Sequence, residues 1–133
     1  MRFVLDASVA INWAMRDESS PVADRAFSVL RTGEALVPGI WWYEVRNILI
    51  VNERRGRIAP ADSNRFLLDL RDFEIATDNE PDSRRVMDLS RRLKQTVYDA
   101  AYLALAIREC LPIATLDKGI EKAAIAEGIA LLV

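Results

Sequence analysis

The chain has 133 residues, a net charge of −2 and a pI of about 5.2, and 51% of its residues are hydrophobic and 29% charged. This balance predicts one folded, soluble domain and excludes a disordered chain. There is no histidine and only one cysteine, Cys110. These absences exclude Ser-His-Asp and Cys-His nucleophilic sites, histidine or thiolate zinc sites, and an internal disulfide, so any catalysis must rest on carboxylates, with or without a hard metal ion.

No segment has the pattern of a leader or a membrane span. The start, "MRFVLD", has too few apolar residues for a signal peptide, and Glu44 and Arg46 interrupt the longest apolar stretches. A single cysteine also suits a reducing compartment. We therefore expect a cytoplasmic protein without membrane contact.

The first half of the chain alternates apolar strands with helices. Residues 2–6 ("RFVLD") and 34–38 ("EALVP") predict short buried strands. A short helix is expected over 7–15, and a second begins at Pro21 after the N-cap Ser20. Further helices are predicted over 40–56, which ends at Gly56, and over 59–72.

The second half continues the alternation. Strands are predicted over 73–77 ("FEIAT"), 112–116 ("PIATL") and 129–133 ("IALLV"). Helices are predicted between them, over 80–94, 96–110 and 117–128. Five short strands joined through helices predict an α/β fold: a single-domain αβα sandwich over residues 1–133 with a mostly parallel five-stranded sheet.

Four acidic residues fall at one edge of this predicted sheet. Asp6 ends the first strand and Asp117 follows the fourth, while Glu44 and Asp99 lie in the first turns of two helices. Strand carboxyl ends and the helix N-termini near them share the edge where α/β proteins bind ligands. Each acid also has a structural alternative, because Asp6 and Asp117 are suitable helix N-caps and "TVYD" (96–99) is a possible capping box.

The four carboxylates together predict a cation. Two carboxylates about 4 Å apart repel by roughly 4 kcal/mol at an effective dielectric constant of about 20. Some of them must therefore be protonated, or a cation must lie among them. Ligands that are all oxygen suit Mg²⁺ or Mn²⁺, the ions that assist phosphodiester hydrolysis.

Neighbouring polar residues are candidates to support these acids. Ser8 follows Asp6 by two positions and Thr115 precedes Asp117 by two, so either hydroxyl can donate to a carboxylate. Asn47, one turn after Glu44, and Asn12 are weaker candidates, because ordinary helix polarity explains both.

Basic residues are concentrated in the middle of the chain, in "NERRGR" (52–57) and "SRRVMDLSRRLK" (83–94). An acidic protein can still present a basic face to nucleic acid. The same runs are also explained as solvated helix faces.

The segments "FVLDASV", "WWYEVRNIL", "TVYDAAYLALA" and "LPIATLD" resemble, in order and spacing, the PIN-domain ribonucleases, and above all the VapC toxins of bacterial toxin–antitoxin pairs. The resemblance covers essentially the whole chain. It implies a homodimer that cleaves RNA endonucleolytically (tRNA, rRNA or mRNA) with Mg²⁺ or Mn²⁺. It also implies that Asp6, Glu44, Asp99 and Asp117 form the metal site, with Ser8 in support.

The resemblance further implies a small antitoxin whose C-terminal segment covers the active-site groove. The aromatic stretch "IWWYEVRNILIV" (40–51) is a candidate surface for antitoxin and dimer contacts, although its aromatic residues also suit a plain core.

Two other functions compete with this interpretation. An aspartyl-phosphate enzyme or phosphoacceptor domain needs a second acid two residues after Asp6, where Ser8 stands. A non-catalytic nucleic-acid-binding or scaffolding protein, whose acids only cap helices, predicts no effect of divalent ions on stability.

Overall fold

A computed structural model of the chain describes residues 1–15 and 17–133, and its centre is a parallel sheet. The sheet has four strands in the order β3-β2-β1-β4. Their bounds are β1 (Arg2–Leu5), β2 (Glu34–Pro38), β3 (Ile75–Asp78) and β4 (Ile113–Ala114). The predicted α/β class and parallel pairing are confirmed, but the predicted fifth strand is wrong.

The segment predicted as the fifth strand, 129–133, makes only an isolated parallel bridge between Ile113 and Leu131. Two backbone hydrogen bonds of 2.9 Å, from Ile113 to Ala130 and from Leu132 to Ile113, hold it beside β4. β4 itself is two residues long, and the residue before it, Pro112, has no N–H to donate. So short a neighbour cannot pair a full strand.

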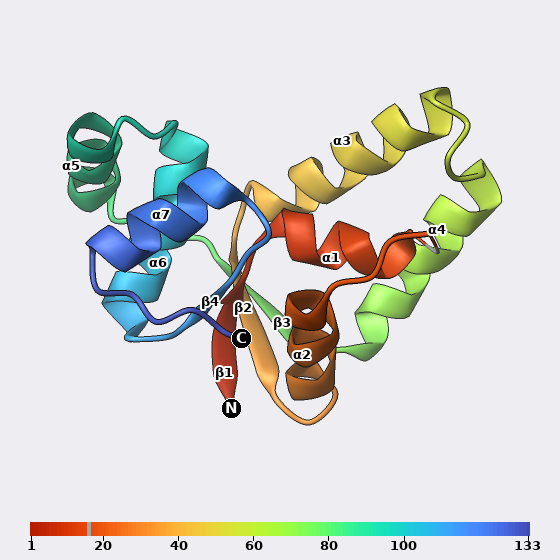
Figure 1. The fold of residues 1–133 in the computed structure, drawn as a ribbon, viewed down its shortest axis with the longest axis horizontal. Helices are drawn as coiled ribbons and strands as arrows, with labels where there is room; N and C mark the ends of the chain where they lie inside the picture. The colour runs from red at the N-terminus through yellow and green to blue at the C-terminus, as the bar shows by residue number, and fades with distance from the viewer. Residues whose placement is uncertain (16) are drawn as a thin grey trace.

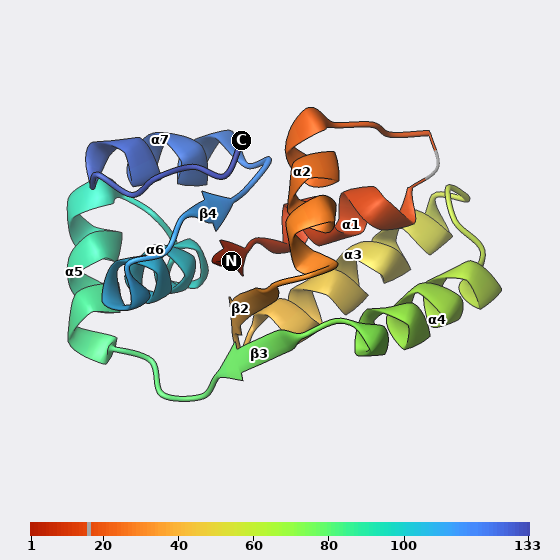
Figure 2. The same cartoon turned by 90° about the horizontal axis from the view of Figure 1, so that it is seen from below.

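Helices cover both faces of the sheet, as Figures 1 and 2 show from two directions. On one side lie α5 (Ser83–Leu93), α6 (Val97–Glu109) and α7 (Lys118–Ala126). On the other lie α1 (Ala7–Ala14), α2 (Pro21–Leu30), α3 (Trp41–Arg54) and α4 (Pro60–Asp69), which continues as the 3-10 turn Leu70–Asp72. The three-layer arrangement predicted from the sequence is therefore present.

The apolar periodicity explains which elements form the core. Phe3, Val4 and Leu5 of β1 are fully buried, and α6 buries Tyr102 and the four residues after it. α6 contacts β1, β2 and β4, so it covers the middle of the sheet. A sequence as apolar as "AAYLALA" suits a helix enclosed on most sides.

Strand order reverses at β1, because β2 and β3 follow on one side of it and β4 lies on the other. In parallel α/β sheets such a point opens a crevice at the carboxyl ends of the strands. Asp6 is the residue directly after β1. The fold therefore places this acid at the position where ligand sites are expected.

The aromatic stretch at the start of α3 is divided between core and surface. Trp41 is fully buried, Trp42 is half-buried, and Tyr43 is 72% exposed. The two tryptophan rings pack edge to face with centroids 4.8 Å apart. Only Tyr43 of these three is therefore a surface residue.

None of the helices in the described part of the chain is long and apolar enough to cross a membrane.

Candidate acidic site at the carboxyl edge of the sheet

Asp6 is the most deeply placed acid of the site, with only 5% of its surface exposed. It occupies the N-cap position of α1, yet its side chain makes no capping hydrogen bond. Instead, its Oδ2 accepts hydrogen bonds from the hydroxyls of Ser8 at 2.7 Å and Thr115 at 2.8 Å. Helix capping therefore does not explain this carboxylate.

Ser8 and Thr115 also tie β1 to the chain that follows β4. The hydroxyl oxygen of Ser8 accepts from the Leu116 N–H at 3.0 Å, and that of Thr115 accepts from the Asp117 N–H at 3.0 Å. Each hydroxyl thus accepts a hydrogen bond from one backbone N–H group and donates one to the Asp6 carboxylate. Both hydroxyls donate to a carboxylate, whereas their support of a catalytic site stays a prediction.

Burial is the main reason that the pKa of Asp6 rises from an ordinary 3.8 to about 6. The hydroxyls of Ser8 and Thr115 lower it, while the negative charges of Glu44 and Asp117 raise it. Placing this carboxylate here therefore costs free energy at neutral pH unless a positive charge compensates.

Glu44, half-buried in the first turn of α3, is held by α6. The hydroxyl of Tyr102 donates a short hydrogen bond to its Oε1. Burial raises the pKa of Glu44, the Tyr102 hydrogen bond lowers it, and the charge of Asp99 raises it. Tyr102 is fully buried, and sequence analysis did not identify it as a site residue.

Asp99 lies half-buried in the first turn of α6, one turn before Tyr102. Its backbone N–H is capped by the Thr96 hydroxyl at 3.1 Å. Half of the predicted capping box is thus present, but the reciprocal bond from the Thr96 N–H to the Asp99 carboxylate is not among the hydrogen bonds of the described residues. Burial and the charge of Asp117 raise the pKa of Asp99, and the Thr96 hydroxyl lowers it.

Asp117 is the one acid of the four that caps its helix. Its Oδ1 accepts from the Ile120 N–H at 2.9 Å, as the structural alternative predicted. A Cβ atom at Gly119 would lie 3.1 Å from this oxygen, so glycine keeps the space beside it open. Asp117 remains exposed, and its charge still acts on Asp6 and Asp99.

The four acids form a closed ring of electrostatic neighbours. Charge repulsion links Asp6 to Glu44 and to Asp117, and links Asp99 to Glu44 and to Asp117. Residues 111 positions apart in sequence are therefore brought to one place, as expected for the carboxyl edge of a parallel sheet.

In three of these carboxylates, one oxygen accepts hydrogen bonds from the protein and the other accepts none from the described residues. Hydrogen bonds from within the protein reach Oδ2 of Asp6, Oε1 of Glu44 and Oδ1 of Asp117. The second oxygen of each is without such a bond among the described residues. This arrangement fixes the carboxylates while leaving acceptor atoms for an external group.

The donor set fits a hydrated divalent ion better than a fully enclosed one. Within residues 1–15 and 17–133, no group of three or more acidic or cysteine side chains is arranged so that it could hold a metal ion. Mg²⁺ usually keeps several waters and binds through one or two carboxylates, so an open ring of oxygen atoms suits it. That Asp6, Glu44, Asp99 and Asp117 hold such an ion stays a prediction.

The weaker supporting candidates do not contact the acids. Asn47 is exposed on α3 and Asn12 is half-buried on α1, and no hydrogen bond in the described residues joins either to the four carboxylates. A role for Asn47 stays a prediction.

Several arginines of the predicted basic runs are already paired. Arg57 bonds Asp17 and Glu18 at 3.3 and 2.8 Å, and Arg92 bonds Asp88 and Glu127 at 2.9 and 2.8 Å. For these arginines the solvated, ion-paired interpretation holds.

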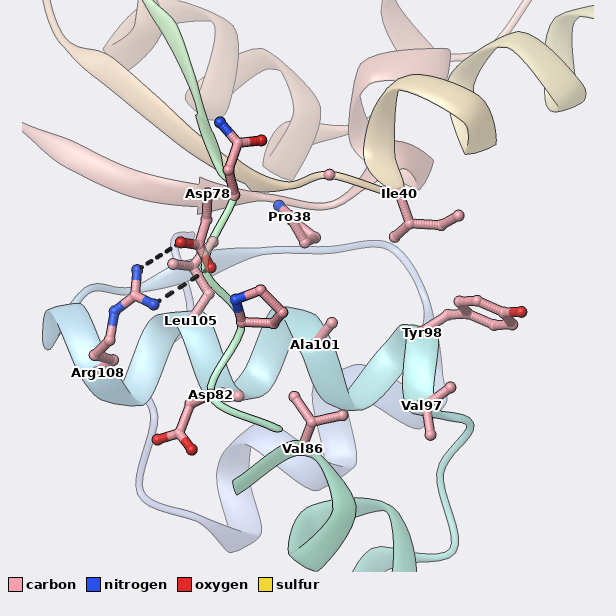
Figure 3. A pocket seen from close by; sticks show the side chains of 14 residues that line it. Pro38, Ile40, Asp78, Asp82, Val86, Val97, Tyr98, Ala101, Leu105 and Arg108 are labelled. Carbon is pink, nitrogen blue, oxygen red and sulfur yellow. Dashed lines mark hydrogen bonds and ion pairs between the residues drawn. The ribbon is translucent and has the colours of Figure 1, made fainter. Parts of the chain in front are cut away.

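Asp78 ends β3, one residue beyond the predicted end of that strand. Arg108 of α6 engages its two carboxylate oxygens at 3.1 and 3.3 Å (Figure 3). This acid is therefore neutralised by a salt bridge, and the phosphoacceptor alternative gains no support from it.

The chain is similar to known proteins over most of its length. The family model described as "PIN domain" matches residues 3–126. Ribonuclease VapC3 of Pyrobaculum aerophilum is 32% identical over 121 residues, which cover 89% of this chain and 91% of that protein.

Two solved structures share the fold at lower identity. PAE2754 from Pyrobaculum aerophilum superposes with a TM-score of 0.72 and 21% identity, covering 92% of this chain and 84% of that one. A toxin–antitoxin complex from Klebsiella pneumoniae gives a TM-score of 0.58 and 18% identity, covering 84% of this chain and 82% of the matched one. At these identities the likeness establishes the fold.

Proposed function

The chain belongs to the PIN-domain family, and we propose that it is a Mg²⁺- or Mn²⁺-dependent endoribonuclease, the toxin of a toxin–antitoxin pair. The observation that carries the proposal is the ring of Asp6, Glu44, Asp99 and Asp117 at the sheet switch point, with three carboxylate oxygens that accept no hydrogen bond from the described residues. The ribonuclease name of the VapC3 relative supports RNA as the substrate.

In this proposal the four acids hold the ion and the phosphodiester beside it. A divalent ion supplies the positive charge that offsets carboxylate repulsion and the charge of the phosphate. Asp6 is fixed by Ser8 and Thr115, and Glu44 by Tyr102, so both carboxylates keep their orientation without the substrate. Sites held on packed elements in this way need little reorganisation when the ligand binds.

The partners follow from the relatives rather than from the geometry. The toxin–antitoxin complex from Klebsiella pneumoniae supports a small antitoxin protein as a partner. A homodimer and a cytoplasmic location complete the proposal, and light scattering of the purified protein measures the dimer directly.

The decisive experiment incubates partner-free protein with total RNA from its own host, in Mg²⁺ or in EDTA, beside Asp99→Asn. We expect discrete fragments that require Mg²⁺ and that the variant does not produce. Asp99 is half-buried and its backbone holds the cap, so the variant keeps the helix start intact.

A non-catalytic PIN-like binding protein is the second candidate, favoured by the single observation that Asp117 does cap its helix. This alternative predicts a melting temperature that Mg²⁺ does not change. One bound ion at 100 times its dissociation constant stabilises a protein by about 2.7 kcal/mol, so a melting curve with and without Mg²⁺ separates the two candidates.

A further inference from the structure

Two tyrosines beside the acidic site are exposed to an extent that the core does not explain. Tyr43 is 72% exposed and directly precedes Glu44, and Tyr98 is 56% exposed and directly precedes Asp99. Both stand in the first turns of the helices that carry these acids, α3 and α6. Each is therefore an exposed aromatic residue one position before a proposed metal-site acid in sequence.

The surface beside Tyr43 contains a fixed indole ring, that of Trp42, and a cationic side chain, that of Arg46. Trp42 donates through Nε1 to the Thr77 hydroxyl at 2.7 Å, which fixes the indole against β3. The Arg46 guanidinium lies 5.7 Å from the centre of the Trp42 ring, and no acidic partner of Arg46 occurs among the salt bridges of the described residues. Together these side chains border a hollow of about 630 Å³, lined by Gly39, Trp42, Tyr43, Arg46, Thr77 and Asn79.

A second hollow, of about 320 Å³, reaches the start of α6 and includes Tyr98. It shares Gly39 and Asn79 with the first, so the two are adjacent. Its walls are largely apolar, with Pro38 and Ile40 facing Ala101 (Figure 3). Arg108 neutralises Asp78 at one end, which reduces the negative charge along this surface.

We propose that Tyr43 and Tyr98 are stacking platforms for unpaired bases of single-stranded RNA on either side of the cleaved phosphate, with Arg46 binding the backbone. The inference rests on the proposed nuclease function and adds to it two residues that contact bases and one that contacts the RNA backbone. Aromatic rings next to an arginine are the usual means of holding unpaired nucleotides, since every base has a face that stacks. The bases of an A-form duplex are already stacked and would not reach these rings.

RNA fits this surface better than a second protein chain does. Tyr43 and Tyr98 directly precede the acids Glu44 and Asp99 in sequence. Arg46, which has no acidic partner among the salt bridges of the described residues, complements a nucleic-acid backbone. A contact between copies of the chain would instead cover Tyr43 and Tyr98 and exclude RNA from them. Molecular mass is therefore measured with every variant below.

The test measures binding without cleavage. A fluorescein-labelled RNA oligonucleotide without self-complementarity is titrated with the protein in EDTA, and fluorescence anisotropy reports the dissociation constant. We expect each of Tyr43→Ala and Tyr98→Ala to weaken binding about 10-fold, the loss of one stacked base. Tyr43→Phe and Tyr98→Phe keep the ring and should bind like the wild type.

Two controls make the result specific to stacking. Leu68→Ala removes a 53% exposed apolar side chain on α4 and should leave binding unchanged. An oligonucleotide of the same length with abasic central positions should bind the wild type and the alanine variants equally. The same RNA annealed to its complement should bind the wild type more weakly than the single strand does.

Several outcomes overturn the proposal. One is that both alanine variants bind RNA with wild-type affinity, and another is that they lose affinity equally for single strands and duplexes. The proposal is also overturned if the wild type does not bind RNA. The same holds if a variant changes molecular mass while keeping its RNA affinity per chain. The nuclease proposal is judged separately by Mg²⁺-dependent cleavage, so stacking without cleavage and cleavage without stacking are distinct results.

Discussion

The hydroxyl of Tyr102 on α6 donates a hydrogen bond to the Glu44 carboxylate on α3. This bond joins two residues 58 positions apart in sequence at the proposed metal site. Tyr102 is fully buried, while Glu44 is half-buried and repelled by Asp99. The bond therefore sets the orientation of a charged side chain that its neighbours push away.

Tyr102→Phe is expected to keep the core packing and remove this bond. A hydrogen bond to a charged group contributes about 1.5–3 kcal/mol, so we expect weaker Mg²⁺ binding by at least about 10-fold. The pKa of Glu44 should also rise, because the hydroxyl lowers it, and the acid limb of the pH–rate profile should move to higher pH. Isothermal titration with Mg²⁺ and the pH profile measure both effects.

Tyr98→Phe is the matched control: it removes an exposed hydroxyl on the same helix that forms no hydrogen bond with Glu44 among the described residues, so the Mg²⁺ affinity should stay as in the wild type. An unchanged pH profile in Tyr102→Phe would show that the bond has only a structural role.

Thr115 links the Asp117 backbone to the Asp6 carboxylate, so its hydroxyl supports two acids at once. Thr115→Val keeps the shape but leaves the buried Asp6 oxygen with one donor, and we expect a loss of about 1–3 kcal/mol in the free energy of unfolding. Thr115→Ser keeps the hydroxyl and should lose much less. Urea unfolding of both variants in EDTA measures the difference, and equal losses would assign the effect to the missing methyl group instead.

The sequence was sufficient to locate the acids at a common edge because strand ends and helix starts are local features. Asp6, Glu44, Asp99 and Asp117 each follow a recognisable strand or begin a helix, and a parallel sheet brings such positions together. Ser8 and Thr115 were found for the same reason, since each stands two residues from an acid.

Tyr102 could not be identified from the sequence, because its pattern is that of a core residue in "AAYLALA" and its partner Glu44 is remote along the chain. The spacing of three residues from Asp99 was the only available signal, and it places the two on neighbouring faces of α6. The pairing of Arg108 with Asp78 could not be predicted for the same reason, since a pairing over 30 positions has no local signature.

The prediction of a fifth strand was wrong for a different reason. "IALLV" has the composition of a buried strand, and Ile129 and Leu132 are indeed buried. Pairing also depends on the length of the neighbour, and β4 has only two residues. Burial follows from composition, whereas ladder length follows from tertiary contacts.

Asp117 has two roles that substitution can separate. Asn is as good an N-cap as Asp, so Asp117→Asn should change the free energy of unfolding in EDTA by less than about 0.5 kcal/mol, whereas Asp117→Ala should lose about 1 kcal/mol with the cap. Both remove the charge, and both should abolish Mg²⁺-dependent cleavage and reduce stabilisation by Mg²⁺. Urea unfolding and cleavage assays on the pair measure this, and full activity in Asp117→Asn would show that the residue is a cap alone.

The raised pKa of Asp6 predicts an unusual dependence of the free energy of unfolding on pH. Its pKa rises from 3.8 to about 6 on folding, so the folded state holds the proton more tightly than the unfolded state. The resulting stability is fully present below pH 3.8 and is lost as the pH rises through about 6. A shift of this size corresponds to about 3 kcal/mol for so buried a group.

The measurement compares urea unfolding of the wild type and Asp6→Asn between pH 4 and pH 8 in EDTA. Asparagine can still accept from Ser8 and Thr115 but carries no charge, so relative to the wild type it should become more stable as the pH rises through about 6. Saturating Mg²⁺ should reverse this order at pH 8, because only the wild-type carboxylate gains from the ion. A difference between the two proteins that does not vary with pH would show that burial does not hold the proton on Asp6, and that the carboxylate needs no cation to balance it.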